Sequence, residues 1–190
     1  MKMKTTCLFV LLALAGTLTA ADKLPVLNYT FTLKPMAESN TAGAFEDPGF
    51  RKLTDGKLKG EYCKVLFQYK DNREKQWPIH FNFKTEVKLS EAKIHYYRER
   101  NSYGIKDIRL IGIQSDGKRI PLGSVVLNQP YRRPDSDPSN MCAVIKSEDD
   151  TPVRSIDVIF TRTGGYLALN EIEFFGEAVK NSKAAESTTP

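Results

Sequence analysis

The feature of this chain that most constrains its fold is an alternation of apolar and polar residues with a period of two. In the stretch 77–83, one face would carry Trp77, Ile79, Phe81 and Phe83, and the other would carry His80 and Asn82. Successive side chains of a β-strand point to opposite faces, so this spacing predicts a strand with one buried face. Pro78 indicates the start or the edge of that strand. Trp77 belongs to the apolar stripe, which favours a core position over a role in stacking on a sugar.

Comparable patterns recur along the rest of the chain. Further apolar stripes run through residues 87–96, with a turn or bulge at Ser90-Glu91, and through 108–113, 120–127 and 155–160. Asp116-Gly117 is typical of a hairpin turn, because glycine adopts positive φ at low cost. A parallel sheet would need helical crossovers, and long amphipathic helices are not apparent in the sequence. The pattern therefore predicts an all-β fold, an antiparallel β-sandwich.

The N-terminus has the composition of an export signal. Lys2 and Lys4 precede an apolar run from Leu8 to Ala15, and small residues follow as far as Ala21. The run is too short to span a bilayer, so a signal peptide over residues 1–21 is favoured over a buried N-terminal helix. We therefore expect a secreted protein, extracellular or periplasmic. It would have one domain over residues 22–178 and a disordered tail over 179–190, which lacks apolar anchors.

Charge and cysteine content narrow the range of partners. The net charge of +5 includes the two signal lysines, and no basic stripe is present, so no nucleic-acid partner is expected. Cys63 and Cys142 remain after signal cleavage. Export permits a disulfide between them if their α-carbons lie within about 7 Å, and two buried free thiols are the alternative. Neither cysteine has a close metal-ligand partner in the sequence, which disfavours a zinc site.

Several short segments occur in an order found in one known superfamily. They are Leu53-Thr54-Asp55-Gly56, the 77–83 strand, Tyr103-Gly104-Ile105-Lys106-Asp107-Ile108, Ser115-Asp116-Gly117, the strand 156–160 and the closing strand 167–176. Over roughly residues 29–177 this order resembles the galactose-binding-like superfamily, which includes the discoidin or coagulation-factor type C domains. It is also similar to family 32 carbohydrate-binding modules. The resemblance implies an antiparallel jelly-roll β-sandwich that binds a ligand through loops at one end and has no catalytic activity.

The resemblance also implies one structural calcium ion at the turn 53–56. Asp55 and Glu171 would supply the side-chain ligands, and backbone carbonyls would complete the six to eight oxygens that calcium prefers. Lys57 and Lys59 follow the turn and would repel a divalent cation. The alternative is an Asp-Gly turn that caps a loop without metal, with Glu171 hydrogen-bonded or exposed.

The loop 96–103 is both basic and aromatic, and the resemblance places it where some relatives recognise sugar with arginine. Arginine offers a fixed fork of donors for hydroxyls or a uronate carboxylate, and tyrosine offers a flat apolar face. The predicted ligand-binding residues are Tyr97, Arg98, Arg100 and Asn101, together with Arg132 in the loop 131–135. A solvated hairpin with salt bridges and a plain connector are the respective alternatives.

Together these features favour a secreted, non-catalytic carbohydrate-binding module. An extracellular adhesion or assembly protein that binds a protein or cell-surface partner is the alternative, because a fold does not fix a function. An enzyme is disfavoured, since neither a nucleophile elbow nor a paired-histidine metal motif occurs in the sequence. Membrane binding is also disfavoured, because the loop 34–49 offers Met36 and Phe45 as its large apolar side chains.

Overall fold

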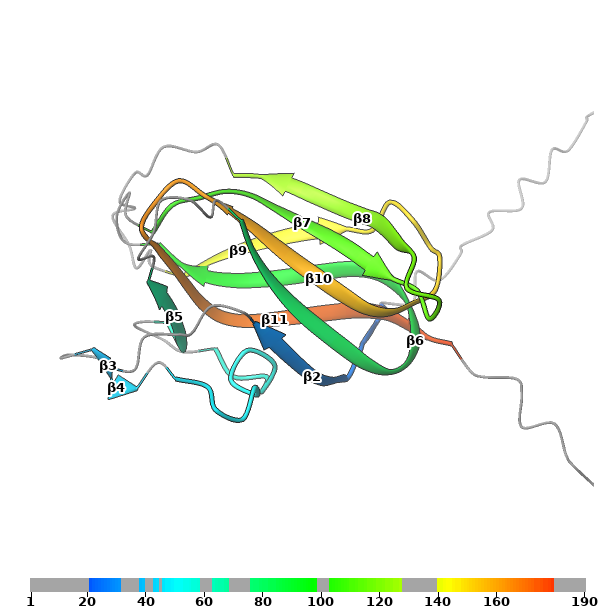
Figure 1. Ribbon diagram of the computed structural model, residues 1–190, viewed down its shortest axis with the longest axis horizontal. Helices are drawn as coiled ribbons and strands as arrows, with labels where there is room; N and C mark the ends of the chain where they lie inside the picture. Colours follow the sequence, from blue (N-terminus) through cyan, green and yellow to red (C-terminus); the bar gives the residue numbers. More distant parts are fainter. Residues whose placement is uncertain are drawn as a thin grey trace, which may run out of the picture.

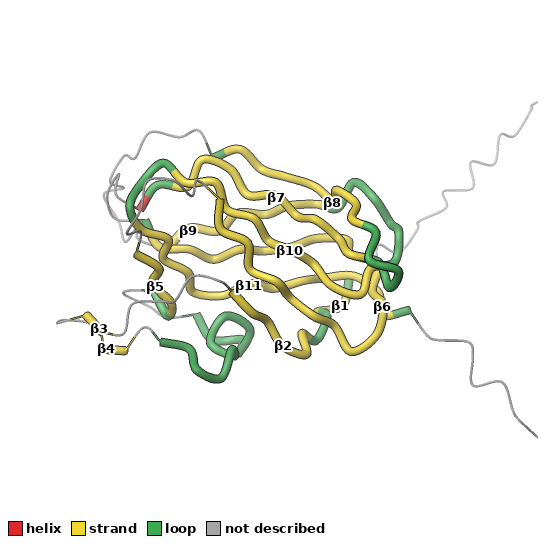
Figure 2. The backbone as a smooth tube through the Cα atoms, viewed as in Figure 1, coloured by secondary structure: helices red, strands yellow, loops and turns green. Residues whose placement is uncertain are grey.

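The computed structural model describes residues 21–31, 38–39, 43–44, 46–58, 63–68, 76–98, 103–127 and 140–179, and they form strands joined by turns (Figures 1 and 2). The strands are β1 (Asp22–Lys23), β2 (Val26–Phe31), β3 (Glu38–Ser39), β4 (Gly43–Ala44), β5 (Val65–Gln68), β6 (Gln76–Tyr97), β7 (Ile105–Ile113), β8 (Arg119–Val126), β9 (Asn140–Lys146), β10 (Val153–Arg162) and β11 (Tyr166–Ala178). Each strand predicted from the alternation lies within one of these.

Strand β6 belongs to both layers of an antiparallel sandwich. Its N-terminal half pairs with β2 and β10, and its C-terminal half pairs with β9 and β11. The first layer continues from β10 through β7 to β8, and in the second layer β5 and β1 pair with β11. Strands β3 and β4 form a separate pair. The long strands run lengthwise along the molecule in Figure 1. The predicted all-β, antiparallel sandwich is confirmed.

The predicted strand 77–83 and the apolar stripe 87–96 belong to a single strand of 22 residues. Opposite this point, Phe175 pairs with Glu91 and Gly176 pairs with Leu89, so Ser90 is the extra residue of a β-bulge. A Cβ atom at Gly176 would overlap the carbonyl oxygen of Lys88, so glycine allows the two backbones to approach here. Of the turn and the bulge that the sequence left open at Ser90-Glu91, the structure has the bulge.

The hydrophobic core lies between the two layers. Trp77, Ile79, Phe81 and Phe83 all face it, with Trp77 only 3% exposed, as the alternation predicts. The Phe81 ring meets the ring of Phe174 from β11 edge-on, with 5.1 Å between their centroids. Such pairs contribute about 0.5–1.5 kcal/mol beyond their buried area. His80 and Asn82 lie on the outer face, where His80 contacts Asp157 at 2.7 Å and Asn82 donates to Asn28 at 2.9 Å.

The structure tests only some of the remaining predictions about the whole chain. Apart from Ala21 and Val179, the predicted signal peptide and tail lie outside the described residues. In the described part of the chain, no helix has the length and apolar character needed to cross a membrane. Cys63, which is buried, and Cys142, which is exposed, are not joined by a disulfide in the structure.

Candidate functional site

The ends of several strands meet at one end of the sandwich, on the left in Figure 1. The register brings Gln68 opposite Tyr166 and Tyr96 opposite Leu169, and it brings both Gln76 and Asp107 opposite Thr161. Connections β5–β6, β6–β7, β8–β9 and β10–β11 therefore start and finish at this same end, which we call the loop end. The β-sandwich thus collects residues that are far apart in sequence on one surface.

Three aromatic side chains, Tyr97, Tyr103 and Tyr166, form a tyrosine cluster at the loop end. The rings of Tyr103 and Tyr166 stack with 5.2 Å between centroids and 27° between planes. Tyr97 meets Tyr103 edge-on at 5.7 Å. Tyr97 is only 5% exposed and packs with Cys63, Leu66 and Ala168, whereas Tyr103 and Tyr166 are half-buried. The stacked pair is therefore the part of the cluster that reaches solvent.

Hydrogen bonds hold this stacked pair in place. The N–H groups of Thr163 and Gly164 donate to the carbonyl oxygen of Gly104 at 2.9 and 3.2 Å, which ties the β10–β11 connection to the residue after Tyr103. Arg162 Nη1 donates to the carbonyl oxygen of Gly164 at 3.0 Å. The Tyr166 hydroxyl accepts a bond from Gln68 Nε2 at 3.3 Å. Both rings are thus fixed from several strands, and a rigid site binds with a smaller entropy cost.

The structure places two of the five predicted ligand-binding residues at this end. Tyr97 is the last residue of β6 and is nearly covered, and Arg98 follows the strand and is half-buried. Arg100, Asn101 and Arg132 lie outside the described residues.

The sequence reasoning missed Tyr103 and Tyr166 as site residues. Tyr103 belongs to the basic-aromatic loop that was identified. The signal for Tyr166 is a glycine pair, Gly164-Gly165, immediately before an aromatic residue that opens the closing strand.

A second polar cluster brings together Asp55 and Glu171, the predicted calcium ligands, around Lys64. The ammonium of Lys64 donates to Asp55 Oδ1 at 2.6 Å and to Glu171 Oε2 at 2.7 Å. The N–H of Gly56 donates to Glu171 Oε1 at 2.9 Å, and the N–H of Lys57 donates to Asp55 Oδ1 at 2.9 Å. The sequence correctly placed the two carboxylates near each other, and it did not identify Lys64.

Burial and donors act differently on the two carboxyl groups. The Glu171 side chain is 1% exposed, and this burial raises its pKa even though Lys64 and Gly56 donate to it. Burial also acts to raise the pKa of Asp55, but it is outweighed by the hydrogen bonds from Lys64 and Lys57, and the pKa is lowered. Asp55 therefore stays ionised at neutral pH.

The side chains of this cluster do not fit a calcium ion as they are arranged. Calcium prefers six to eight oxygen atoms. Here the carboxylates of Asp55 and Glu171 already accept the ammonium of Lys64, and the turn directs N–H groups at them. Within the described ranges, no group of three or more His, Cys, Asp or Glu side chains could hold a metal ion. Calcium remains a prediction of the family resemblance.

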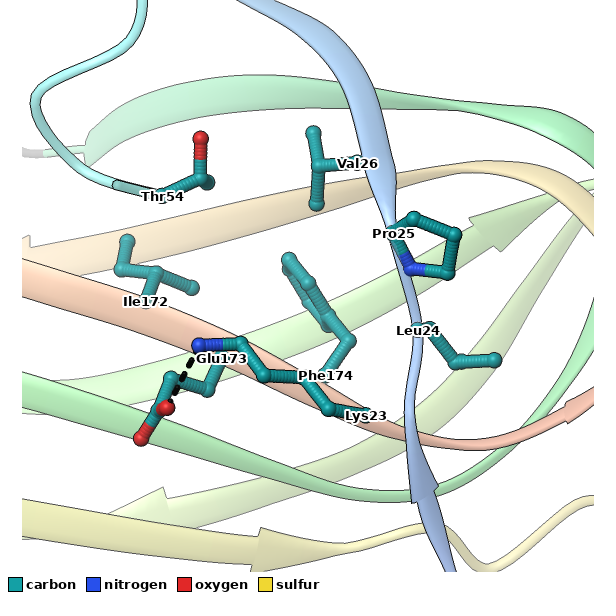
Figure 3. A pocket seen from close by; sticks show the side chains of 8 residues that line it. All are labelled: Lys23, Leu24, Pro25, Val26, Thr54, Ile172, Glu173 and Phe174. Atoms are coloured by element: carbon teal, nitrogen blue, oxygen red, sulfur yellow. Dashed lines mark hydrogen bonds and ion pairs between the residues drawn. The ribbon is translucent and has the colours of Figure 1, made fainter. Parts of the chain in front are cut away.

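A cavity of about 380 Å³ lies beside the turn 53–56 (Figure 3). Its lining residues are Lys23, Leu24, Pro25, Val26, Thr54, Ile172, Glu173 and Phe174. The charged groups at this cavity are paired with each other, since Lys23 Nζ lies 2.7 Å from Glu173 Oε1. The lining is otherwise mainly apolar, so this cavity offers a sugar fewer polar contacts than the loop end does.

Comparisons with known proteins identify the fold. No protein-family model and no curated protein matches the chain. The C-terminal domain of a chitobiase from Bacteroides fragilis superposes with a TM-score of 0.55 at 17% identity, covering 84% of this chain and 100% of that domain. CpGH89CBM32-5 from Clostridium perfringens, in complex with GalNAc-β-1,3-galactose, gives 0.56 at 14% identity, covering 82% of this chain and 100% of that one.

A third similar structure is the family 32 module of NanJ from Clostridium perfringens, in complex with galactose. Its TM-score is 0.53 at 11% identity, with 78% of this chain and 92% of that chain covered. At such low identities these likenesses establish the fold alone. The chain has the galactose-binding-like sandwich fold of family 32 modules, as the sequence motifs predicted.

Proposed function

We propose that this galactose-binding-like sandwich binds carbohydrate at its loop end, without catalysing a reaction, and does so outside the cytoplasm after loss of its signal peptide. Fold similarity supports the ligand class, since two of the similar structures are complexes with galactose and with GalNAc-β-1,3-galactose. The N-terminal sequence pattern supports the location.

The observation that carries this proposal is the stacked pair Tyr103 and Tyr166. Both rings are partly exposed where loops converge, and both are held by neighbouring strands. A pyranose ring has apolar C–H faces that pack on aromatic rings, while its hydroxyls need nearby donors and acceptors. Arg98, which follows β6 at the same end, has a guanidinium group that can supply such donors.

Binding without turnover is the activity that these groups supply best. Stacking rings and an arginine fork contribute affinity and orientation, whereas glycoside hydrolysis requires a pair of carboxyl groups flanking the scissile bond.

Glycan-array screening of the wild type, followed by affinity electrophoresis on the polysaccharides that score, tests the proposal. We expect Tyr166→Ala and Tyr103→Ala to weaken binding at least about tenfold, and Tyr166→Phe to retain most of it because the ring remains. Phe175→Ala is the matched control, because Phe175 is a half-buried aromatic residue on β11 that contacts Lys93, away from the tyrosine cluster.

Two results would reject this site. Binding by Tyr166→Ala and Tyr103→Ala that equals binding by Phe175→Ala would remove the tyrosine cluster from the ligand site. Failure of the wild type to bind any glycan, together with a cross-linked protein partner that Tyr166→Ala loses, would favour the adhesion or assembly function.

A further inference from the structure

The turn 53–56 surrounds a lysine side chain at the point where the family resemblance implies a divalent cation. We propose that the ammonium of Lys64 is the built-in cation of this turn, so that the domain closes on a covalently attached charge in place of a calcium ion. The proposal does not depend on the ligand of the loop end.

The contacts of Lys64 are those of a bridging cation. Its Nζ atom lies 2.6 Å from Asp55 Oδ1, on the turn, and 2.7 Å from Glu171 Oε2, on β11. The exposed fractions of the Lys64 and Glu171 side chains are 10% and 1%. A buried charge is tolerated when it is paired and hydrogen-bonded, so each of these two groups accounts for the burial of the other.

Backbone groups of the turn donate hydrogen bonds to the two carboxylates. Gly56 and Lys57 direct N–H groups at Glu171 Oε1 and Asp55 Oδ1, each at 2.9 Å. A calcium ion would instead need backbone carbonyl oxygens to point at the same centre. Lys23 Nζ adds a second positive charge 3.9 Å from Glu171 Oε1. Three hydrogen-bond donors and this second charge thus converge on two carboxylates.

Lys64 is also placed to join three segments of the fold. Its backbone N–H donates to the carbonyl oxygen of Leu169 at 2.9 Å, immediately before β5 begins. The turn is tied to β11 separately, since the N–H of Ile172 donates to the carbonyl oxygen of Leu53 at 2.7 Å. The Lys64 side chain therefore closes a link between the entry to β5, the turn 53–56 and β11.

The first experiment compares the wild type in millimolar calcium and in excess chelator. We expect the thermal midpoint to agree in both within about 1 °C, and calorimetric titration with calcium chloride to give no saturable heat, because a ligand that binds the folded state must raise its stability. Saturable calcium binding with a raised midpoint would overturn the proposal. This comparison needs no variant.

The second experiment removes the charged group and keeps the length of the aliphatic stem. Lys64→Met leaves Glu171 buried without its ammonium partner, and we expect the midpoint to fall by roughly 5–15 °C. The matched control is Lys93→Met, whose side chain is 39% exposed and whose Nζ lies 3.5 Å from Glu91. A loss of this surface pair should lower the midpoint by no more than about 4 °C.

A third measurement separates charge from packing. Glutamine at position 171 keeps an oxygen for the Gly56 N–H and carries no charge. We expect Glu171→Gln to lower the midpoint of the wild type and to raise that of Lys64→Met, because it removes the orphaned charge. The same shift in both backgrounds would show that Lys64 and Glu171 are not coupled, and the built-in cation would be rejected.

Discussion

At the scale of single residues, Tyr29 shows how one buried hydroxyl organises the segment that leads into the turn 53–56. Tyr29 is fully buried, and its hydroxyl donates to Asp47 and accepts the N–H of Leu53 at 3.0 Å. Asp47 in turn accepts the N–H groups of Arg51 and Lys52 at 3.0 and 3.1 Å. Burial raises the pKa of Tyr29, and the hydrogen bond to Asp47 raises it further, so the phenol stays protonated.

Removing that hydroxyl should destabilise the fold. In Tyr29→Phe, Asp47 loses a donor and the Leu53 N–H loses its acceptor inside the protein. An unsatisfied buried group costs about 1–3 kcal/mol, and we expect the free energy of unfolding to fall by that amount in urea titrations. Tyr166→Phe is the control, because its hydroxyl is half-buried and makes one bond of 3.3 Å, and it should cost less than about 1 kcal/mol. Equal losses in the two variants would contradict this role of Tyr29.

Residue-level features of the candidate site were partly accessible from the sequence. Asp55 and Glu171 could be paired because the family motifs place them together, whereas Lys64 lies outside those motifs and contacts both through the tertiary fold. Tyr97 was predicted to contact ligand. Local sequence could not show that Cys63 and its neighbours cover it on the outer face of the second layer.

At the scale of elements, the long strand β6 explains how one segment serves two layers. The period-two pattern located its buried residues correctly, but Ser90-Glu91 has the same local signal for a turn and for a bulge. The deciding feature is on the partner strand, where Gly176 lets the backbone of β11 approach Lys88 and continue the pairing past Ser90. The sequence therefore predicted which residues of β6 are buried. Whether β6 continues past Ser90 could be known only from its partner strand β11.

A methyl group at Gly176 should disrupt this crossing. In Gly176→Ala the added Cβ would meet the carbonyl oxygen of Lys88, and backbone cannot move aside as a flexible side chain can. Overpacking of this kind costs roughly 1–3 kcal/mol or more, to be measured by chemical denaturation. At Gly165 a Cβ would meet nothing within 4 Å, so Gly165→Ala should be neutral or slightly stabilising. A neutral Gly176→Ala would show that the two strands are not in close contact.

Strand β11 also carries a pH-dependent contribution at Glu173. Burial acts to raise the pKa of this carboxyl, but hydrogen bonds with Lys23 and His95 outweigh it and the pKa is lowered. A carboxyl whose pKa is lower in the folded state stabilises the fold above its unfolded pKa, about 4.3, and loses that effect as the pH falls through the folded pKa. Glu173→Gln should therefore be less stable than the wild type at roughly neutral pH and as stable as the wild type in strong acid. Parallel curves of unfolding free energy against pH would contradict this assignment.

At the scale of the whole molecule, the shared strand makes the two layers one unit of stability. Because β6 pairs with β2 and β10 in one layer and with β9 and β11 in the other, neither layer can separate without breaking the other's ladder. Antiparallel architecture was predictable because alternation and hairpin signals are local. The pairing of distant strands depends on contacts that no local pattern records. It could be predicted from the family resemblance, and so could the meeting of several strand ends at one end of the sandwich.

The two cysteines offer a direct test of this single unit. Cys63 is fully buried against Leu66, Tyr97 and Ala168 on the outer face of the second layer, and Cys142 is exposed on β9. Burial raises the pKa of the Cys142 thiol, so alkylation by iodoacetamide is best followed by mass spectrometry at mildly alkaline pH. In a chain carrying Cys7→Ser, we expect Cys142 to react in the folded protein. Cys63 should react at a rate that falls in step with the global unfolding equilibrium as urea is withdrawn. Fast labelling of Cys63 without urea would show that the edge of the second layer opens independently of the rest of the sandwich.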